Sequence, residues 1–171
     1  MRAASYLTVV QIPEQLYRAF LRQNGLVERT RQILDNRRFL QETFLFGELV
    51  GFPVERAVAA AMQPIRVPAG REIPSGDGSR LVLVGSGEVE LLFDGQRCEL
   101  LGRGAYCGED ALLYGKGPFA ARAVSDAELY AIPARIISDI PIVQWNLLQT
   151  AERRLQHPAL GKVRPTRASG P

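Results

Sequence analysis

Residues 88–101 read EVELLFDGQRCELL and carry the clearest local structural signal in the sequence. Two runs rich in apolar residues, 88–93 and 96–101, flank the dipeptide Asp94-Gly95. Asp-Gly favours a positive φ at both central positions of a two-residue turn, and that turn matches the twist of paired strands. The stretch therefore predicts an antiparallel hairpin.

The surrounding residues continue the same pattern. From Ile65 to Ile132, short alternating runs are broken by Gly and Asp, which is typical of an antiparallel all-β unit. The Gly-centred turns between residues 72 and 93 suit the tight corners of a small barrel. The predicted strands are Ile65–Val67, Arg71–Ile73, Arg80–Val84, Glu88–Phe93, Arg97–Leu101, Ala120–Val124 and Glu128–Ile132.

Helical patterns lie on both sides of this unit. A helix is predicted from Pro13 to the stop signal Asn24-Gly25, a second over about 26–46, and a third over 53–62. After the strands, residues 134–139 and a longer segment from Pro141 predict two more helices. The predicted class is α+β, an antiparallel β-roll of the jelly-roll type flanked by N-terminal helices and a C-terminal helix. We divide the chain into a helical region at 1–62, the roll with its helix at 63–157, and a disordered basic tail at 158–171.

The basic charge does not belong to the predicted body. The chain has a formal net charge of +3 and a pI near 9.1. Residues 1–157 contain 18 basic and 18 acidic side chains, so the whole excess comes from Lys162, Arg164 and Arg167 in the tail. The body therefore lacks the bulk field that steers proteins onto nucleic acids or membranes.

Several function classes become less favoured on composition. The single histidine, His157, excludes His-cluster metal sites and disfavours His-based catalysis, so we expect no enzyme. Cys98 and Cys107 are interpreted as reduced thiols in the cytoplasm, with a strained disulfide as the alternative. No apolar run is long enough to span a membrane. The excess of arginine over lysine hints at a GC-rich bacterial genome.

Four stretches carry a family resemblance. They are VPAGREI at 67–73, LVGSGEVEL at 83–91, LGRGAYCGEDALL at 101–113 and SDAELYAIP at 125–133. With these residues, the chain from about Phe46 to Leu155 resembles the cyclic nucleotide-binding domain family.

The resemblance implies a ligand site. In that family a β-roll cradles a cyclic nucleotide, and a short helix inside the roll points its N-terminus at the phosphate. Gly108 would let the backbone approach the ligand, and Glu109 would accept a hydrogen bond from the ribose. Ala111 and Leu112 would provide small apolar packing. The last helix would act as a lid or dimer helix.

One departure bears on the phosphate. The family motif Pro-Arg-x-Ala-Ser/Thr corresponds here to GKGPFAARA at 115–123. Alignment on Pro118 puts Phe119 at the arginine position, and alignment from Ser125 puts Gly117 there. A buried phosphate without its arginine loses about 2–5 kcal/mol. Lys116 or Arg122 is the candidate replacement, Ala120 is a further pocket candidate, and Phe119 is a pocket filler or a stacking platform.

The sequence leads to two functional hypotheses. The preferred one is a non-enzymatic regulatory module with a degenerate pocket, no certain cofactor, and a protein partner or homodimer. The alternative is a working cAMP or cGMP sensor that uses Lys116 or Arg122 for the phosphate. No room remains after the last helix for a helix-turn-helix module, so we expect no DNA-binding domain. The candidate interface residues are Phe39, Phe44, Trp145 and Leu148.

Overall fold

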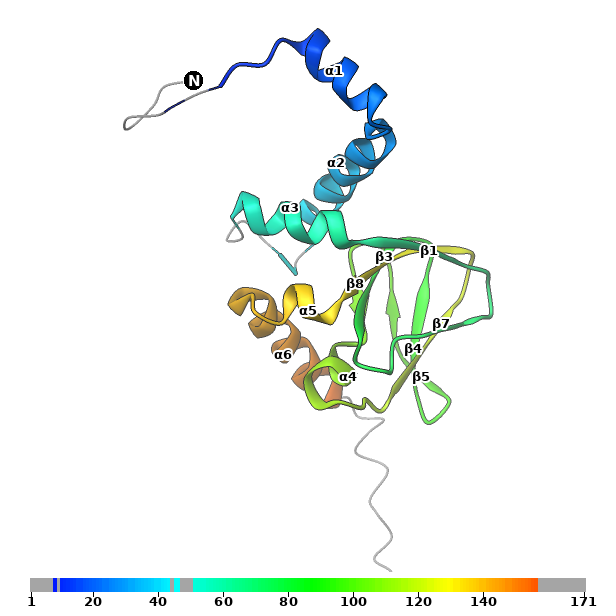
Figure 1. The fold of residues 1–171 in the computed structure, drawn as a ribbon. Coiled ribbons are helices and arrows are strands. Elements are labelled where there is room, and N and C mark those ends of the chain that lie inside the picture. The colour runs from blue at the N-terminus through cyan, green and yellow to red at the C-terminus, as the bar shows by residue number, and fades with distance from the viewer. Residues whose placement is uncertain (1–7, 9, 44, 47–50, 157–171) are drawn as a thin grey trace, which may run out of the picture.

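A computed structural model describes residues 8, 10–43, 45–46 and 51–156 (Figure 1). Phe44, His157 and the basic tail lie outside the described residues. The described elements, in chain order, are α1 (Glu14–Gln23), α2 (Val27–Gln41), α3 (Phe52–Ala61), β1 (Gln63–Val67), β2 (Glu72–Ile73), β3 (Arg80–Ser86), β4 (Val89–Phe93), β5 (Gln96–Leu101), β6 (Tyr106–Cys107), α4 (Glu109–Tyr114), β7 (Phe119–Ala123), β8 (Ala127–Pro133), α5 (Ala134–Ile137) and α6 (Pro141–Leu155).

The strands form a roll of two antiparallel sheets, ordered β1-β8-β3-β6 and β2-β7-β4-β5. This confirms the predicted α+β class. The predicted hairpin is β4–β5, in which Phe93 pairs with Gln96. Both turn residues have positive φ, 49° at Asp94 and 75° at Gly95, as the Asp-Gly signal requires.

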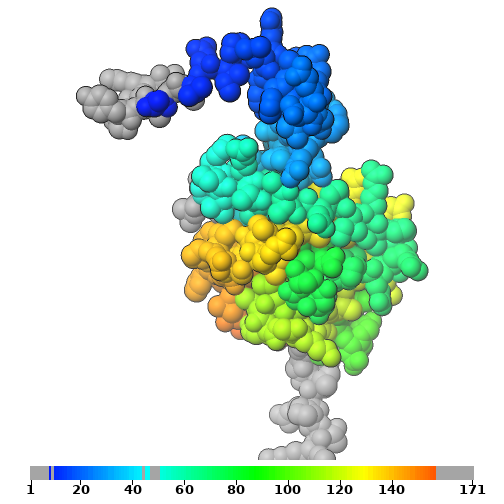
Figure 2. All heavy atoms as spheres, in the orientation of Figure 1, coloured from blue at the N-terminus to red at the C-terminus, as the bar shows by residue number. Residues whose placement is uncertain are grey.

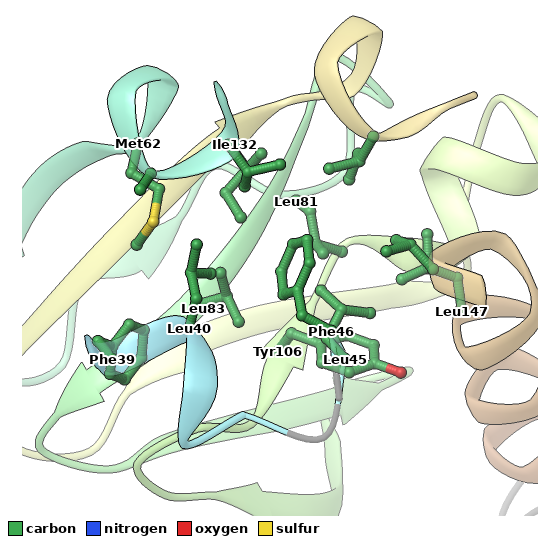
Figure 3. Close-up of a cluster of buried hydrophobic side chains, with 14 residues drawn as sticks. Phe39, Leu40, Leu45, Phe46, Met62, Leu81, Leu83, Tyr106, Ile132 and Leu147 are labelled. Atoms are coloured by element: carbon green, nitrogen blue, oxygen red, sulfur yellow. The ribbon is translucent and has the colours of Figure 1, made fainter. Parts of the chain in front are cut away.

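Strand β3 separates two hydrophobic clusters. Its alternate residues face opposite sides of the sheet, so Leu81 and Leu83 pack against the helices while Val82 and Val84 fill the roll. All four side chains are fully buried. The cluster on the helix side of β3, which contains Leu81 and Leu83, is called the helical cluster below. Figure 3 shows it, with Phe46 and Leu147 next to Leu81.

The N-terminal helices differ from the prediction in two ways. Helix α2 ends at Gln41 and does not continue to residue 46, because the Thr43 hydroxyl donates to the Leu40 carbonyl (2.8 Å) and the chain turns. Phe39, predicted as an interface residue, is 3% exposed and packs against Tyr130, so it belongs to the core of its own chain.

Two further predictions concern short or exposed features. The two-residue strand β6 was missed because it is too short for an alternation signal.

The interface candidates on α6 lie at its surface, where Trp145 is 57% exposed and Leu148 is half-buried. None of the described helices is long and apolar enough to cross a lipid bilayer.

The helical cluster should dominate the attachment of α6. We expect Leu147→Ala to lower the free energy of unfolding by about 2–5 kcal/mol, because it removes a fully buried side chain and leaves a cavity. The control Leu100→Ala removes the same atoms from a residue that is 48% exposed, and should cost about 0.5 kcal/mol. Equal losses in denaturant unfolding would show that α6 is not held by this cluster.

Candidate functional site

The site is built around the start of helix α4, inside the roll. Gly108 precedes the helix with φ +92°, a conformation that residues with a side chain rarely adopt. A Cβ on Gly108 would also lie 2.8 Å from the Ser75 carbonyl oxygen. The glycine is therefore required here, because it lets the chain turn tightly and place Glu109 in the interior.

Glu109 forms a buried ion pair with the C-terminal helix. Its side chain is 1% exposed, and Oε1 accepts a hydrogen bond of 2.6 Å from Nη1 of Arg154 on α6. Arg154 itself is only 5% exposed. The second oxygen, Glu109 Oε2, has no hydrogen-bond partner within the described part of the chain. The carboxylate that the family resemblance assigns to a ribose is thus held by a residue of the protein.

Arg154, on α6, bonds to three elements of the roll: α4, β5 and β6. Besides Glu109, its Nε donates to Oε2 of Glu99 on β5 (2.6 Å) and its Nη2 donates to the Tyr106 carbonyl (2.9 Å). Arg153 makes a more exposed bond of 3.1 Å to Oε1 of Glu99. The Tyr106 hydroxyl adds a contact with the Thr150 hydroxyl (2.6 Å). The C-terminal end of α6 is therefore fixed against the roll.

Burial and charge act against each other on these carboxylates. Burial raises the pKa of Glu109 above its ordinary value, although Arg154 opposes the shift. Burial also acts to raise the pKa of Glu99, but there Arg154 and Arg153 prevail and the pKa is lowered. Glu109 is consequently the carboxylate whose ionised form depends most on its cation.

A small cavity remains at this end of the roll. It has a volume of about 160 Å³. Ligand pockets usually span about 300–1,000 Å³, so this one is small for a nucleotide. Its wall consists of Leu91, Cys98, Glu99, Phe119, Arg153 and Arg154.

The predicted replacements for the phosphate arginine do not enter this cavity. Strand β7 alternates, so Phe119, Ala121 and Ala123 are buried while Ala120 and Arg122 are exposed. Arg122 instead pairs with Glu90 on the neighbouring strand β4, with Nη2 2.6 Å from Oε1. The strand register thus points Ala120 and Arg122 outward in this structure, and their part in binding a ligand stays a prediction.

The loop before β7 is held by a second buried carboxylate. Asp110 is 3% exposed and accepts the Phe119 backbone N–H at 3.4 Å. Lys116, in this loop, is exposed and does not line the cavity. The loop conformation directs Phe119 inward, where its ring meets Phe93 edge-on at 6.2 Å between centroids.

The remaining predicted pocket residues support α4 from behind. Ala111 is 1% exposed, and Leu112 packs against the helical cluster. Neither contributes to the cavity wall. In this structure they seat α4, and their contact with a ligand stays a prediction.

Sequence reasoning missed the residues that define the site. Arg154 and Glu99 lie 45 and 10 residues from Glu109 along the chain, and no local motif joins them. A signal existed in the pair Arg153-Arg154 near the end of α6, a helix with only one other charged residue, Glu152. The described residues contain no group of three or more His, Cys, Asp or Glu that could hold a metal ion.

Comparison with known proteins identifies the fold. A family model described as "Cyclic nucleotide-binding domain" matches residues 68–140. The search of curated proteins found no significant match. Among solved structures, the regulatory domain of Toxoplasma gondii PKA co-crystallised with cAMP shares 27% identity at a TM-score of 0.57, over 69% of this chain and 47% of that chain.

Two further structures come from Trypanosoma brucei. The regulatory subunit of a cAMP-independent protein kinase A has a TM-score of 0.63 and 16% identity, over 82% of this chain and 52% of that chain. A triple variant of it, with one Glu→Ala, one Thr→Arg and one Val→Ala change, is bound to cAMP in its A site. It gives a TM-score of 0.62 and 16% identity, over 84% and 54%. The chain thus spans about half the length of these kinase subunits, and at this identity the likeness concerns the fold alone.

The buried ion pair should be far more important for stability than its exposed neighbour. We expect Arg154→Met to lower the free energy of unfolding by about 3–5 kcal/mol, because Glu109 is left as an uncompensated buried charge. Arg153→Met, at a residue whose side chain is 66% exposed, should cost less than about 1 kcal/mol. The double variant Arg154→Met/Glu109→Gln should regain most of the loss.

The cost of Arg154→Met should also depend on pH. Without its cation, Glu109 has a pKa raised by burial with nothing to oppose it. The folded state then binds a proton more tightly than the unfolded state, so the deficit relative to wild type shrinks as pH falls through that raised pKa. Unfolding measured at neutral and mildly acidic pH tests this, and a deficit that does not change with pH would contradict it.

Proposed function

We propose that this chain, whose residues 68–140 match the model of the cyclic nucleotide-binding domain family, is a non-enzymatic regulatory module. In this proposal its roll does not bind cAMP or cGMP as a nucleotide sensor does, and the module acts through contacts with other proteins. The observation that carries this proposal is the ion pair between Glu109 and Arg154.

The first support is the state of Glu109. A ribose hydroxyl would have to reach a carboxylate that is 1% exposed, whose Oε1 is already paired with a guanidinium and whose Oε2 is the remaining acceptor. Breaking a buried pair of this kind costs about 3–5 kcal/mol, whereas a hydrogen bond to a neutral hydroxyl returns less. The nucleotide would therefore bind against an intramolecular competitor, and the cavity beside it has a volume of only about 160 Å³.

The second support is that neither basic residue between α4 and the end of β7 faces inward, while the buried Arg154 is already paired with Glu109 and Glu99. A cyclic phosphate in a buried site needs a charged partner, for which arginine is best suited. Lys116 and Arg122 are the basic residues between 115 and 123, and both are exposed. The inward position after Pro118 is occupied by Phe119, an apolar ring that is 8% exposed.

The Trypanosoma subunits provide a parallel for this proposal. One is described as cAMP-independent, and a variant that includes a Thr→Arg change is described with cAMP bound. By analogy, we infer that an arginine at the inward position of Phe119 would favour cAMP binding by the present chain.

A regulatory module without a nucleotide needs a surface for its output. Helix α6 is held on the roll by Arg154 and Tyr106 and presents Trp145 outward, 57% exposed. A tryptophan on a surface is the residue type most enriched at binding hot spots. We propose Trp145 and Leu148 as contacts for a protein partner on this helix.

Titration calorimetry of the wild-type chain with cAMP and cGMP tests the proposal. We expect no binding in the micromolar range, because no inward residue replaces the phosphate arginine and Glu109 is buried and paired through Oε1 with Arg154. Micromolar affinity for either nucleotide would overturn the proposal and support the sensor hypothesis.

A gain-of-binding experiment is a sharper test. Phe119→Arg places a guanidinium on the inward face of β7 and should tighten cAMP binding by about 30-fold or more, the equivalent of about 2 kcal/mol. The matched control Ala120→Arg adds the same charge one residue later, on the outward face, and should leave binding unchanged. Equal cAMP affinities for the two variants would show that binding does not depend on whether the added arginine faces into or out of the roll.

A further inference from the structure

Helix α1 stands apart from the rest of the molecule. Figures 1 and 2 show it projecting beyond α2 and clear of the roll, and none of its ten residues is buried. Leu16, Tyr17 and Phe20 are 65%, 45% and 54% exposed. Three large apolar side chains are therefore presented to solvent on an arm that a second molecule can reach without meeting the roll.

A helix of this kind is poorly stable alone. Isolated helices shorter than about 12–15 residues are marginal in water, and most helical stability in proteins comes from packing of an apolar face. The side-chain support within α1 comes from exposed contacts: an ion pair between Glu14 and Arg18, a bond from Arg22 Nε to the Arg18 carbonyl (3.4 Å) and a bond from the Asn24 side chain to the Phe20 carbonyl (2.8 Å). The apolar face therefore needs a covering surface.

The order of side chains on this apolar face favours a second copy of α1 as its partner. Leu16, Tyr17, Phe20 and Leu21 share one side of the helix, while the charged residues Glu14, Arg18 and Arg22 lie outside that arc. Read from either end, the arc has the same order: a leucine, an aromatic ring, a gap of two residues, an aromatic ring and a leucine. A second copy running antiparallel presents the same arc, so Tyr17 of each chain lies opposite Phe20 of the other.

We propose that α1 is the pairing helix of a homodimer, in which two copies of the helix lie antiparallel across a two-fold axis and cover each other's apolar face. Such an interface is isologous, the commonest arrangement in soluble oligomers. The antiparallel orientation also places the positive N-terminal end of each helix dipole beside the negative C-terminal end of its partner. Pairing through α1 is independent of what the roll binds.

The uncharged arc favours a second copy over an anionic surface. A basic helix on an anionic membrane or an acidic protein would bring its arginines into the contact, but here they lie away from the apolar side chains. With one acidic and two basic residues, α1 also carries little net charge to attract such a surface.

Sedimentation velocity over a wide concentration range tests the proposal. We expect the wild-type chain to reach twice its 18.9 kDa mass, and Phe20→Glu to remain at the single-chain mass with an unchanged unfolding midpoint. The matched control Trp145→Glu alters the exposed aromatic residue on α6 and should stay dimeric.

Three outcomes would overturn the proposal. The first is a wild-type chain that is monomeric at all concentrations. The second is a dimer that is lost with Trp145→Glu and retained with Phe20→Glu, which would move the interface to α6. The third is a monomer that co-sediments with vesicles of anionic lipid and loses this binding with Phe20→Glu.

Cross-linking tests the antiparallel register. Chains carrying Tyr17→Cys and chains carrying Phe20→Cys, both with Cys98→Ser, are mixed and mildly oxidised. Cys107 does not interfere, because it is fully buried and burial raises its pKa to about 12. Intact mass should show mainly the mixed disulfide, whereas a predominance of the two symmetric disulfides would indicate parallel helices and overturn the arrangement.

Discussion

The Arg154 guanidinium is the interaction on which the rest of the structure depends. It is buried, yet each of its bonds leads to a different element: to Glu109 on α4, to Glu99 on β5 and to the backbone of Tyr106 on β6. A buried charge must be paired, so the positions of these groups are mutually constrained. The position of the C-terminal end of α6 and the state of Glu109 both follow from this one side chain.

The chemistry of the cavity depends on which residues of strand β7 face into the roll. Because successive residues face opposite sides of a sheet, Phe119 enters the roll and Arg122 reaches Glu90 on the outside. Asp110 fixes the preceding loop by accepting the Phe119 backbone N–H, and so helps to set which residues of β7 face inward. The same fold with a cation at the inward position would present a different ligand site, which illustrates why function is argued from the site and not from the fold.

The described helices differ in whether their apolar faces are buried in the core or exposed to solvent. Helices α2, α3 and α6 bury their apolar faces against the outer side of β3 and β8, as the helical cluster shows. Helix α1 does not take part, although its sequence is more amphipathic than theirs. The sharp turn at Asn24-Gly25, where Gly25 has φ +63°, directs α1 away from the body and leaves its apolar face free.

The sequence by itself determined the class of the fold. The Asp94-Gly95 hairpin, the order of helices and strands, and the glycines at the corners are local signals, since turn geometry and residue alternation act over a few positions. The family resemblance, not these local signals, pointed to Gly108 and Glu109 at the start of a short helix within the roll. The same resemblance placed Phe119 or Gly117 where the family has its arginine.

Only the tertiary structure decided what Glu109 contacts and which residues line the cavity. Arg154 reaches Glu109 across 45 residues of chain, and Arg122 turns outward through a strand register that depends on pairing with β4. Such contacts arise from packing between distant segments, and no periodicity or motif records them. The sequence therefore provided the scaffold, while the long-range pairing of one buried arginine set the state of the site.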